Sequence, residues 1–196
     1  MKAKAAVLYQ MELPLPYRES QPLVVEEIEL TGPGPGEVLV EIGGAGLCHS
    51  DLSVINGSRP RVMPMVMGHE ASGTVRALGP GVHDLEIDDH VVFSFMPVCG
   101  HCIPCATGHS ALCENGARTN AEGALLTGER HFRDSEGRLL NHHLGVSAFS
   151  QYTIAAQESL IKIDPALPLE KAALFGCAVM TGVGAVVNTA DVEPGT

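Results

Sequence analysis

Four of the chain's six cysteines lie within one short segment. Residues 99 to 113 read CGHCIPCATGHSALC, which gives the spacing C-x2-C-x2-C-x7-C for Cys99, Cys102, Cys105 and Cys113. Four thiolates so close together suit a tetrahedral Zn²⁺ site without an open position, which stabilises a fold and does no chemistry. Gly100 and Gly108 allow the chain to turn tightly around such an ion. A disulfide cluster or a set of unrelated free thiols is the alternative, and with four sulfurs present His101 and His109 are expected at the surface.

The two remaining cysteines stand far apart, at positions 48 and 177. Taken singly, each is more often a small buried hydrophobic residue than a ligand. Their neighbours favour a second site, because Cys48 lies in GLCHSDL and the segment MGHEASGTVRALGPGV follows it. Cys48, His69 and Cys177 would form a Cys₂His set that leaves one position of Zn²⁺ free for water or substrate. Such an ion can polarise a carbonyl and favour the alkoxide of an alcohol. Asp51 and Glu70 fit supporting roles, one orienting the histidine and one near the metal.

Length, composition and charge narrow the class of protein. With 196 residues, 45% of them hydrophobic and 18% charged, the chain has the composition of one globular domain with a real core. Its formal charge of −11 argues against nucleic acid or an anionic membrane as a partner. No apolar run reaches the length of a bilayer crossing, and the first residues lack a signal-peptide core. We therefore expect a cytoplasmic protein, in which structural disulfides are disfavoured.

Together these motifs resemble the zinc-containing medium-chain alcohol dehydrogenases. The segment from Gly68 to Val82 reads G-H-E-x2-G-x5-G-x2-V, the zinc signature of that family, and CHSD at 48–51 and FGCAVMTGVGA at 175–185 match two further family blocks in order. The resemblance extends over essentially the whole chain. It implies a barrel-like, GroES-like (chaperonin-10-like) catalytic domain over residues 1–167 that carries a structural-zinc lobe at 99–113.

The resemblance also implies the role of each cysteine. It makes Cys48, His69 and Cys177 the ligands of a catalytic zinc ion, and it assigns the second, structural zinc ion to the remaining four cysteines, Cys99, Cys102, Cys105 and Cys113. Two Zn²⁺ per chain would account for all six cysteines, and we found no other interpretation that does so.

Further roles follow by position from the same resemblance. Ser50 matches the hydroxyl that exchanges a proton with the alcohol oxygen, and with Asp51 and Glu70 it completes the expected catalytic group. His49 matches a position that contacts the cofactor pyrophosphate, and Thr181 one near the nicotinamide. An ordinary surface serine or histidine, and a helix threonine bonded to a carbonyl, are the plainer alternatives. The walls of the substrate pocket are expected to be Phe95, His143 and Leu144, although Phe and Leu are more often plain core.

The sequence departs from the family pattern in three places. Many relatives end the proton relay in a histidine three residues after the serine, where this chain has Ser53. The usual Gly-Asp turn before a strand reads Asp88-Asp89-His90-Val91, and Asp tolerates the left-handed backbone conformation better than most residues. The segment from Asn115 to Ala148 is expected to be long and irregular.

The elements that must position these residues are mainly strands. Short apolar runs, AAVLY, LVVEEIEL, EVLVEIGGAG, ASGTVRAL and HVVFSF, are separated by turns rich in Gly and Pro. Because no helical period separates them, they favour a barrel-like β domain over a βαβ unit. We expect a short helix at residues 48–56 that carries Cys48 and Ser50. From Pro168 onward, small and apolar residues recur at three- and four-residue spacing, which predicts helices over 168–196.

A dinucleotide fingerprint is absent from the sequence. GGAGLC and TGVGAV both lack the third glycine of G-x-G-x-x-G. The helices of 168–196 are therefore expected to lead to a Rossmann domain outside this chain, which would bind NAD(P), and to expose apolar surface that favours association between copies. By itself the chain is expected to bind two Zn²⁺ and to show little or no hydride transfer between an alcohol or aldehyde and NAD(P).

Two functions remain open from the sequence. The first is the catalytic part of a zinc-dependent alcohol dehydrogenase. The second is a stand-alone zinc-binding β-barrel module without dehydrogenase activity, in which Cys48, His69 and Cys177 do not converge.

Overall fold

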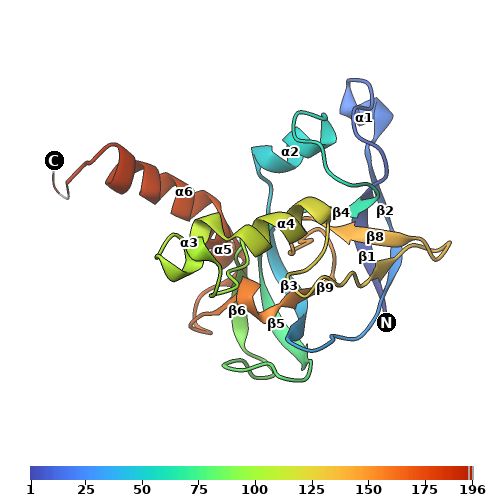
Figure 1. Cartoon of the computed structure of the whole chain (residues 1–196). Coiled ribbons are helices and arrows are strands. Elements are labelled where there is room, and N and C mark those ends of the chain that lie inside the picture. The colour runs from blue at the N-terminus through green and yellow to red at the C-terminus, as the bar shows by residue number, and fades with distance from the viewer. Residues whose placement is uncertain (194, 196) are drawn as a thin grey trace.

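The strands form a closed barrel and a second, five-stranded sheet in the computed structural model, which describes residues 1–193 and 195 (Figure 1). The barrel order is β1 (Lys2–Leu8), β2 (Leu23–Leu30), β7 (Phe132–Arg133), β8 (Leu139–His142) and β4 (Met65–Val66). The second sheet has the order β10 (Leu160–Lys162), β6 (His90–Phe93), β5 (Glu70–Leu78), β3 (Glu37–Gly46) and β9 (Tyr152–Ala156). Neighbouring strands are antiparallel except β4 and β8, which are parallel. The predicted fold class, mainly β and barrel-like, is confirmed.

Alternation of small apolar and polar residues builds the barrel interior. In β1 the side chains of Ala3, Ala5 and Val7 are buried, while Lys2 and Lys4 between and beside them face solvent. This period of two is what a strand with one buried face requires. The same residues pack with Ile28 and Phe132 and others into one apolar cluster, so the barrel has its own core.

Short helices lie between and beyond the strands. They are α1 (Tyr17–Ser20), α2 (His49–Ile55), α3 (Ile103–Ala106), the 3₁₀ turns Ser110–Leu112 and Gln157–Ser159, and α4 (Glu114–Glu122). Helix α2 lies where the sequence predicted a short helix at residues 48–56. Asp88, in the unusual turn before β6, adopts the left-handed conformation with φ of 70°.

The prediction of an irregular segment from Asn115 to Ala148 is wrong. This segment holds most of α4 and both β7 and β8. The helix escaped prediction because its sequence, ENGARTNAE, has almost no apolar stripe: the buried face consists of Gly116, Thr119 and Asn120. Its ends are instead defined by a cysteine sulfur at the N-terminus and by left-handed Gly123 at the C-terminus.

Of the helices predicted over residues 168–196, helical segments form from Leu169 to Thr189, and residues 194 and 196 lie outside the described residues. These segments are α5 (Leu169–Ala172), the 3₁₀ turn Ala173–Gly176, α6 (Ala178–Gly184) and the π-helical turn Ala185–Thr189. Figure 1 shows α6 running away from the sheets, and Met180 and Val183 on it are 57% and 58% exposed. No single helix in the described residues is long and apolar enough to cross a membrane; only Leu169–Gly176 and Ala178–Thr189 together, which meet at 52°, reach that length and apolar content.

Candidate metal centres

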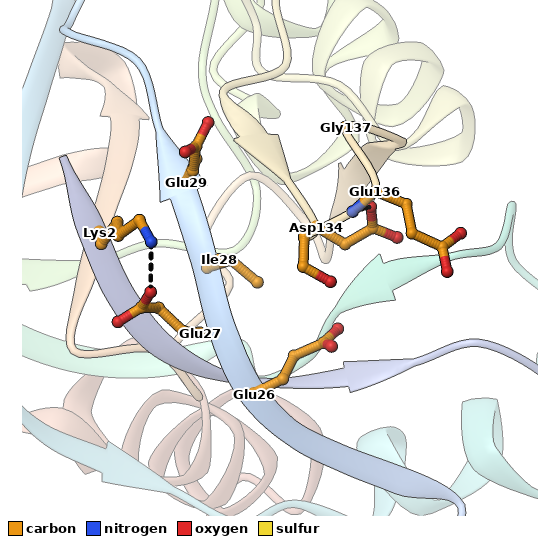
Figure 2. A pocket seen from close by; sticks show the side chains of 9 residues that line it. Lys2, Glu26, Glu27, Ile28, Glu29, Asp134, Glu136 and Gly137 are labelled. Atoms are coloured by element: carbon orange, nitrogen blue, oxygen red, sulfur yellow. Dashed lines mark hydrogen bonds and ion pairs between the residues drawn. The ribbon is translucent and has the colours of Figure 1, made fainter.

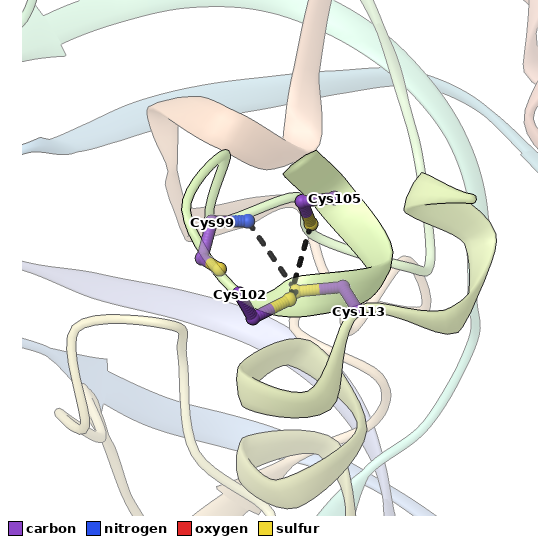
Figure 3. A group of neighbouring side chains, drawn as sticks. All are labelled: Cys99, Cys102, Cys105 and Cys113. Carbon is purple, nitrogen blue, oxygen red and sulfur yellow. Dashed lines mark hydrogen bonds between the residues drawn. The ribbon is translucent and has the colours of Figure 1, made fainter. Parts of the chain in front are cut away.

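The four-cysteine lobe brings its sulfur atoms together around one point (Figure 3). All four Sγ atoms lie within 4.8 Å of one another, with Cys102 and Cys105 3.4 Å apart and Cys102 and Cys113 4.0 Å apart. Ligands of a tetrahedral zinc ion with Zn–S of about 2.3 Å stand roughly 3.8 Å from each other. The spacing of these sulfurs therefore matches a closed Cys₄ zinc site.

Backbone turns and amides prepare the lobe for thiolates. Gly100 and Gly108 have φ of 79° and 81°, the left-handed region that glycine enters without strain. The sulfur of Cys113 accepts hydrogen bonds from the backbone N–H groups of Cys99, at 3.4 Å, and Gly116, at 3.3 Å, the second of which caps α4. The backbone amide of His101 and the side-chain amide of Asn115 lower the pKa of Cys99 to about 5. These donors favour the charged form of sulfur that binds metal.

The second centre is assembled from three remote parts of the chain. Cys48 precedes α2, His69 precedes β5, and Cys177 lies between the 3₁₀ turn Ala173–Gly176 and α6. Their ligand atoms, together with a carboxylate oxygen of Glu70, lie within 4.8 Å of one another. His69 and Glu70 are buried and the two cysteines are half-buried. The alternative in which the three residues point apart is not what the structure shows.

Two glycines let these segments approach. A Cβ on Gly46, just before Cys48, would lie 2.3 Å from the Glu70 carboxylate. A Cβ on Gly176, just before Cys177, would lie 2.1 Å from the carbonyl oxygen of Phe93 at the end of β6. Both distances are far below van der Waals contact, so a larger residue at either position would displace a ligand-bearing segment.

Asp51 connects the ligands to one another. One carboxylate oxygen, Oδ1, lies 3.0 Å from Nδ1 of His69, and the other, Oδ2, accepts the backbone N–H of Cys48 at 3.1 Å. The first contact directs Nε2 of His69 toward the two sulfurs and fixes the tautomer, as a carboxylate behind a zinc-bound histidine does. The same Oδ1 lies 3.3 Å from Nδ1 of His143. The two histidines hold the pKa of Asp51 well below its usual value against the opposing effect of burial.

The electrostatics of this centre call for a cation. Burial, with the nearby negative charges of Cys48 and Glu70, raises the pKa of Cys177 to about 12. Burial also opposes ionisation of Cys48, but the backbone and side chain of Ser50 and the ring of His69 outweigh it and lower the pKa of that thiol. Two thiolates and a carboxylate this close repel one another unless positive charge stands among them. The donor set of two sulfurs and one imidazole nitrogen fits Zn²⁺.

The residues predicted to take part in proton and cofactor contacts lie at different distances from the centre. Ser50 is half-buried in the first turn of α2 beside Cys48, with its N–H 3.5 Å from Cys48 Sγ. His49 is exposed on the same helix, and its Nδ1 lies 3.3 Å from Oγ of Ser53. Thr181 is exposed on α6, one turn after Cys177, and its backbone N–H donates to the carbonyl oxygen of Cys177 at 2.9 Å. The roles of these residues stay predictions.

The predicted substrate walls divide into two groups. Phe95 and Leu144 line one cavity of about 220 Å³. Phe95 also packs edge-on against His69, with ring centroids 6.0 Å apart, so this ring lies between the cavity and the metal centre. His143, only 1% exposed, does not line this cavity but contacts Asp51 instead. The structure thus places His143 beside Asp51, whereas its sequence neighbour Leu144 lines the cavity.

Two residues of this cavity carried no sequence signal. Arg59 and Arg61 lie in the loop after α2, and both line the cavity together with Phe95 and Leu144. Arginine in a loop is ordinarily a solvated surface residue, so the sequence by itself gave no reason to select them.

A larger cavity of about 550 Å³ lies elsewhere, between β2 and the turn after β7 (Figure 2). Glu26, Glu29 and Glu136 line it, and Lys2 pairs with Glu27 at 2.7 Å on its edge. It contains neither cysteine nor histidine, so it lacks the ligands that zinc prefers. Within the described residues, the clusters of cysteine and histidine ligand atoms lie at the two cysteine centres.

Comparison with known proteins agrees with this arrangement. Residues 34–165 match the family described as "Alcohol dehydrogenase GroES-like domain". The S-(hydroxymethyl)glutathione dehydrogenase of Synechocystis is 39% identical over 196 residues, which are 100% of this chain and 51% of that protein.

Two solved structures are similar over nearly the whole chain. An alcohol dehydrogenase zinc-binding domain protein from Burkholderia ambifaria superposes with a TM-score of 0.87 at 36% identity, covering 98% of this chain and 50% of that one. The benzyl alcohol dehydrogenase of Acinetobacter calcoaceticus has a TM-score of 0.81 at 33% identity, covering 99% and 50%. The chain therefore spans about half the length of these relatives.

Proposed function

Because this chain belongs to the family of alcohol dehydrogenase GroES-like domains, we propose that it is the catalytic part of a zinc-dependent alcohol dehydrogenase. The reaction is hydride transfer between an alcohol or aldehyde and NAD(P). The observation that carries the proposal is the convergence of Cys48, His69 and Cys177 within 4.8 Å. A Cys₂His set leaves one position of Zn²⁺ free for substrate, whereas four cysteines leave none.

Each residue of the centre has a task in this proposal. Zinc bound by the two sulfurs and His69 supplies Lewis acidity toward an alcohol or carbonyl oxygen. Asp51 holds the imidazole of His69 in one orientation through the 3.0 Å contact. Ser50, half-buried beside Cys48, takes the proton of the alcohol as hydride leaves its carbon, and returns it in the reverse direction.

The outer end of the proton route lies on the same helix. His49 is exposed, and Ser53 lies 3.3 Å from its ring nitrogen, so a proton that leaves Ser50 has a polar path toward water. This pair would replace the histidine that many relatives have at the position of Ser53. His49 is also the residue of this helix that we assign to the cofactor pyrophosphate.

The four-cysteine lobe has a structural task in the proposal. Its second Zn²⁺ would tie the loop before α4 to the body of the domain, with no coordination position left for substrate. NAD(P) would bind mainly to a part of the enzyme outside this chain, and the exposed apolar side chains of α6 would pack there or against a second copy.

Metal counting and activity together test the function. We expect the zinc-loaded protein that contains this chain to hold two Zn²⁺ per chain and to form NADH or NADPH from a simple alcohol such as benzyl alcohol. Cys48→Ala should remove one Zn²⁺ and abolish this oxidation while the circular dichroism spectrum is kept. A single Zn²⁺ in both proteins, with no oxidation, would favour the zinc-stabilised β-barrel module instead.

A further inference from the structure

The cavity beside the metal centre has a basic wall. Arg59 and Arg61 line it, and no acidic residue does. Its other lining residues are apolar or neutral, namely Phe95, Met96, Ala117, Asn120, Ala121 and Leu144. The volume of about 220 Å³ suits a small organic group rather than a drug-sized ligand. A ligand in this cavity therefore meets two guanidinium groups at one end.

Neither arginine is neutralised within the described residues. No carboxylate oxygen lies within 4.0 Å of either guanidinium group, and the one hydrogen bond from the Arg61 side chain is a long contact of 3.5 Å to the carbonyl of Pro60. The Nε atom of Arg61 is buried without a partner. Burial, with repulsion from Arg59, lowers the pKa of the Arg61 guanidinium. A buried donor without an acceptor is unfavourable unless a ligand provides one.

Other arginines of the chain show the contrast. Arg76 pairs with Glu41 at 2.8 Å, Arg138 with Asp134 at 2.7 Å, and Arg118 with Glu122 at 3.2 Å. The chain has 23 acidic and 12 basic residues, so carboxylates are plentiful. Arg130 and Arg133 also lack a carboxylate partner, but each donates to amide or carbonyl oxygens of the chain at 2.6 to 3.0 Å. Arg61, whose buried Nε atom has no acceptor, differs from all of these, and an oxygen of a ligand would supply the acceptor.

One aromatic ring links this cavity to the metal centre. Phe95 lines the cavity and packs against the ligand His69. The side-chain oxygen of Asn120, buried and without a partner, offers an acceptor on the same wall.

We propose that Arg59 and Arg61 bind an anionic oxygen group of the substrate, so that the alcohol or aldehyde carries a carboxylate or a phosphate at the end away from the reacting carbon. The inference rests on the proposed function for the identity of the reacting end. Guanidinium groups recognise both anions through paired N–H donors. The aromatic ring of Phe95 would pack against the part of the substrate between the two ends.

Matched ligands test the inference by binding as well as by turnover. The probes are 4-(hydroxymethyl)benzoate, its uncharged methyl ester, and 4-(hydroxymethyl)phenyl phosphate, titrated calorimetrically into the zinc-loaded protein. We expect one of the two anions to bind at least about tenfold more tightly than the ester, since a hydrogen bond to a charged group contributes roughly that much. The stronger of the two anions identifies the group. Equal affinity for all three probes would overturn the inference.

Variants locate the effect. Arg61→Met and Arg59→Met should each reduce the preference for the anion over the ester by about tenfold, and Arg61→Lys should keep part of it. Arg18→Met is the matched control, because Arg18 is exposed and far along the chain, and it should keep the full preference. If Arg61→Met fails to fold, the exposed Arg59→Met and the lysine variant still decide.

Two further outcomes separate this inference from its alternatives. Loss of inorganic pyrophosphate binding in Arg59→Met and Arg61→Met, with the preference for anionic alcohols unchanged, would assign the arginines to the cofactor and overturn the inference. Preference for an anion without any alcohol oxidation would support the inference about the cavity and count against the dehydrogenase proposal alone.

Discussion

The two cysteine centres differ in how far apart their ligands lie in the sequence. The lobe takes all four ligands from residues 99–113, whereas the second centre gathers residues 48, 69 and 177. The lobe sulfurs are held by turns and backbone amides of their own segment. The second centre depends on glycines that let three segments meet and on a buried carboxylate that joins two of the ligands.

This difference suggests a division of labour. A local ligand set needs little of the remaining fold to form, so its metal can stabilise the chain early and permanently. A remote set exists only once the barrel and the five-stranded sheet are packed, so its geometry can be tuned by neighbours such as Asp51. A cavity lies near each centre, since Phe95 lines one close to the remote centre and Cys99 lines another, of about 330 Å³, at the lobe. The lobe should therefore govern stability and the remote centre should govern reactivity.

Removing a ligand of the lobe is the strongest test of this difference between the two centres. Cys113→Ala deletes a fully buried sulfur that accepts two backbone hydrogen bonds and caps α4. Because the metal and the helix cap are lost together, we expect a loss of more than about 4 kcal/mol in the free energy of unfolding. Thermal unfolding and zinc content measure it, and one Zn²⁺ should be lost.

The control for that variant lies in the same lobe. Thr107→Ala removes a hydroxyl that donates to the carbonyl of Ile103 at 2.9 Å and touches no sulfur. It should keep both zinc ions and change stability little. A Cys113→Ala protein as stable as this control would show that the lobe does not carry the stability of the domain.

The corresponding change at the remote centre should affect stability less. Cys48→Ala removes one ligand and the sulfur that accepts the N–H of Ser50 at the start of α2. Losing such a cap costs about 1 kcal/mol, and the centre should lose its Zn²⁺ while the lobe keeps its own. If unfolding temperature falls as far as in Cys113→Ala, the division of labour is wrong.

The supporting carboxylate gives a finer test. Asp51→Asn keeps the shape of a side chain that is 3% exposed but removes the charge that faces His69 and His143. We expect zinc affinity at the remote centre to fall about ten- to a hundredfold, measured by competition with a chelator. Asp134→Asn is the matched control: Asp134 is also 3% exposed but pairs with Arg138, away from both centres. Equal affinity in the two variants would show that Asp51 has no role in orienting the ligand.

The distance in sequence between contacting residues explains which features the sequence could predict. The lobe was recognisable from spacing alone because its ligands are neighbours, and the run LVVEEIEL matches β2 because its length and β-branched content are local properties. The remote set was suggested by the chemistry of its residues and their neighbours, but its assignment as the ligands of one ion needed the family resemblance, since no local rule joins residues 48 and 177. Contacts that depend on tertiary packing left no signal: His143 against Asp51, and buried Glu37 at 2.7 Å from His131, are examples.

The smallest expected effect concerns pH at the lobe. Asn115→Ala removes a side-chain N–H that lies 3.3 Å from the sulfur of Cys99. The backbone amide of His101 and this donor together lower the pKa of Cys99 to about 5. Without the donor the pKa rises, and protons compete with zinc for the sulfur at a higher pH. The pH at which the lobe releases half its zinc should therefore move upward by a small amount, because the backbone donor of His101 remains. The pH of zinc release at the remote centre should not change, because Asn115 belongs to the lobe. A shift of this pH at both centres would mean that the two metals are released together and that the two sites are not independent.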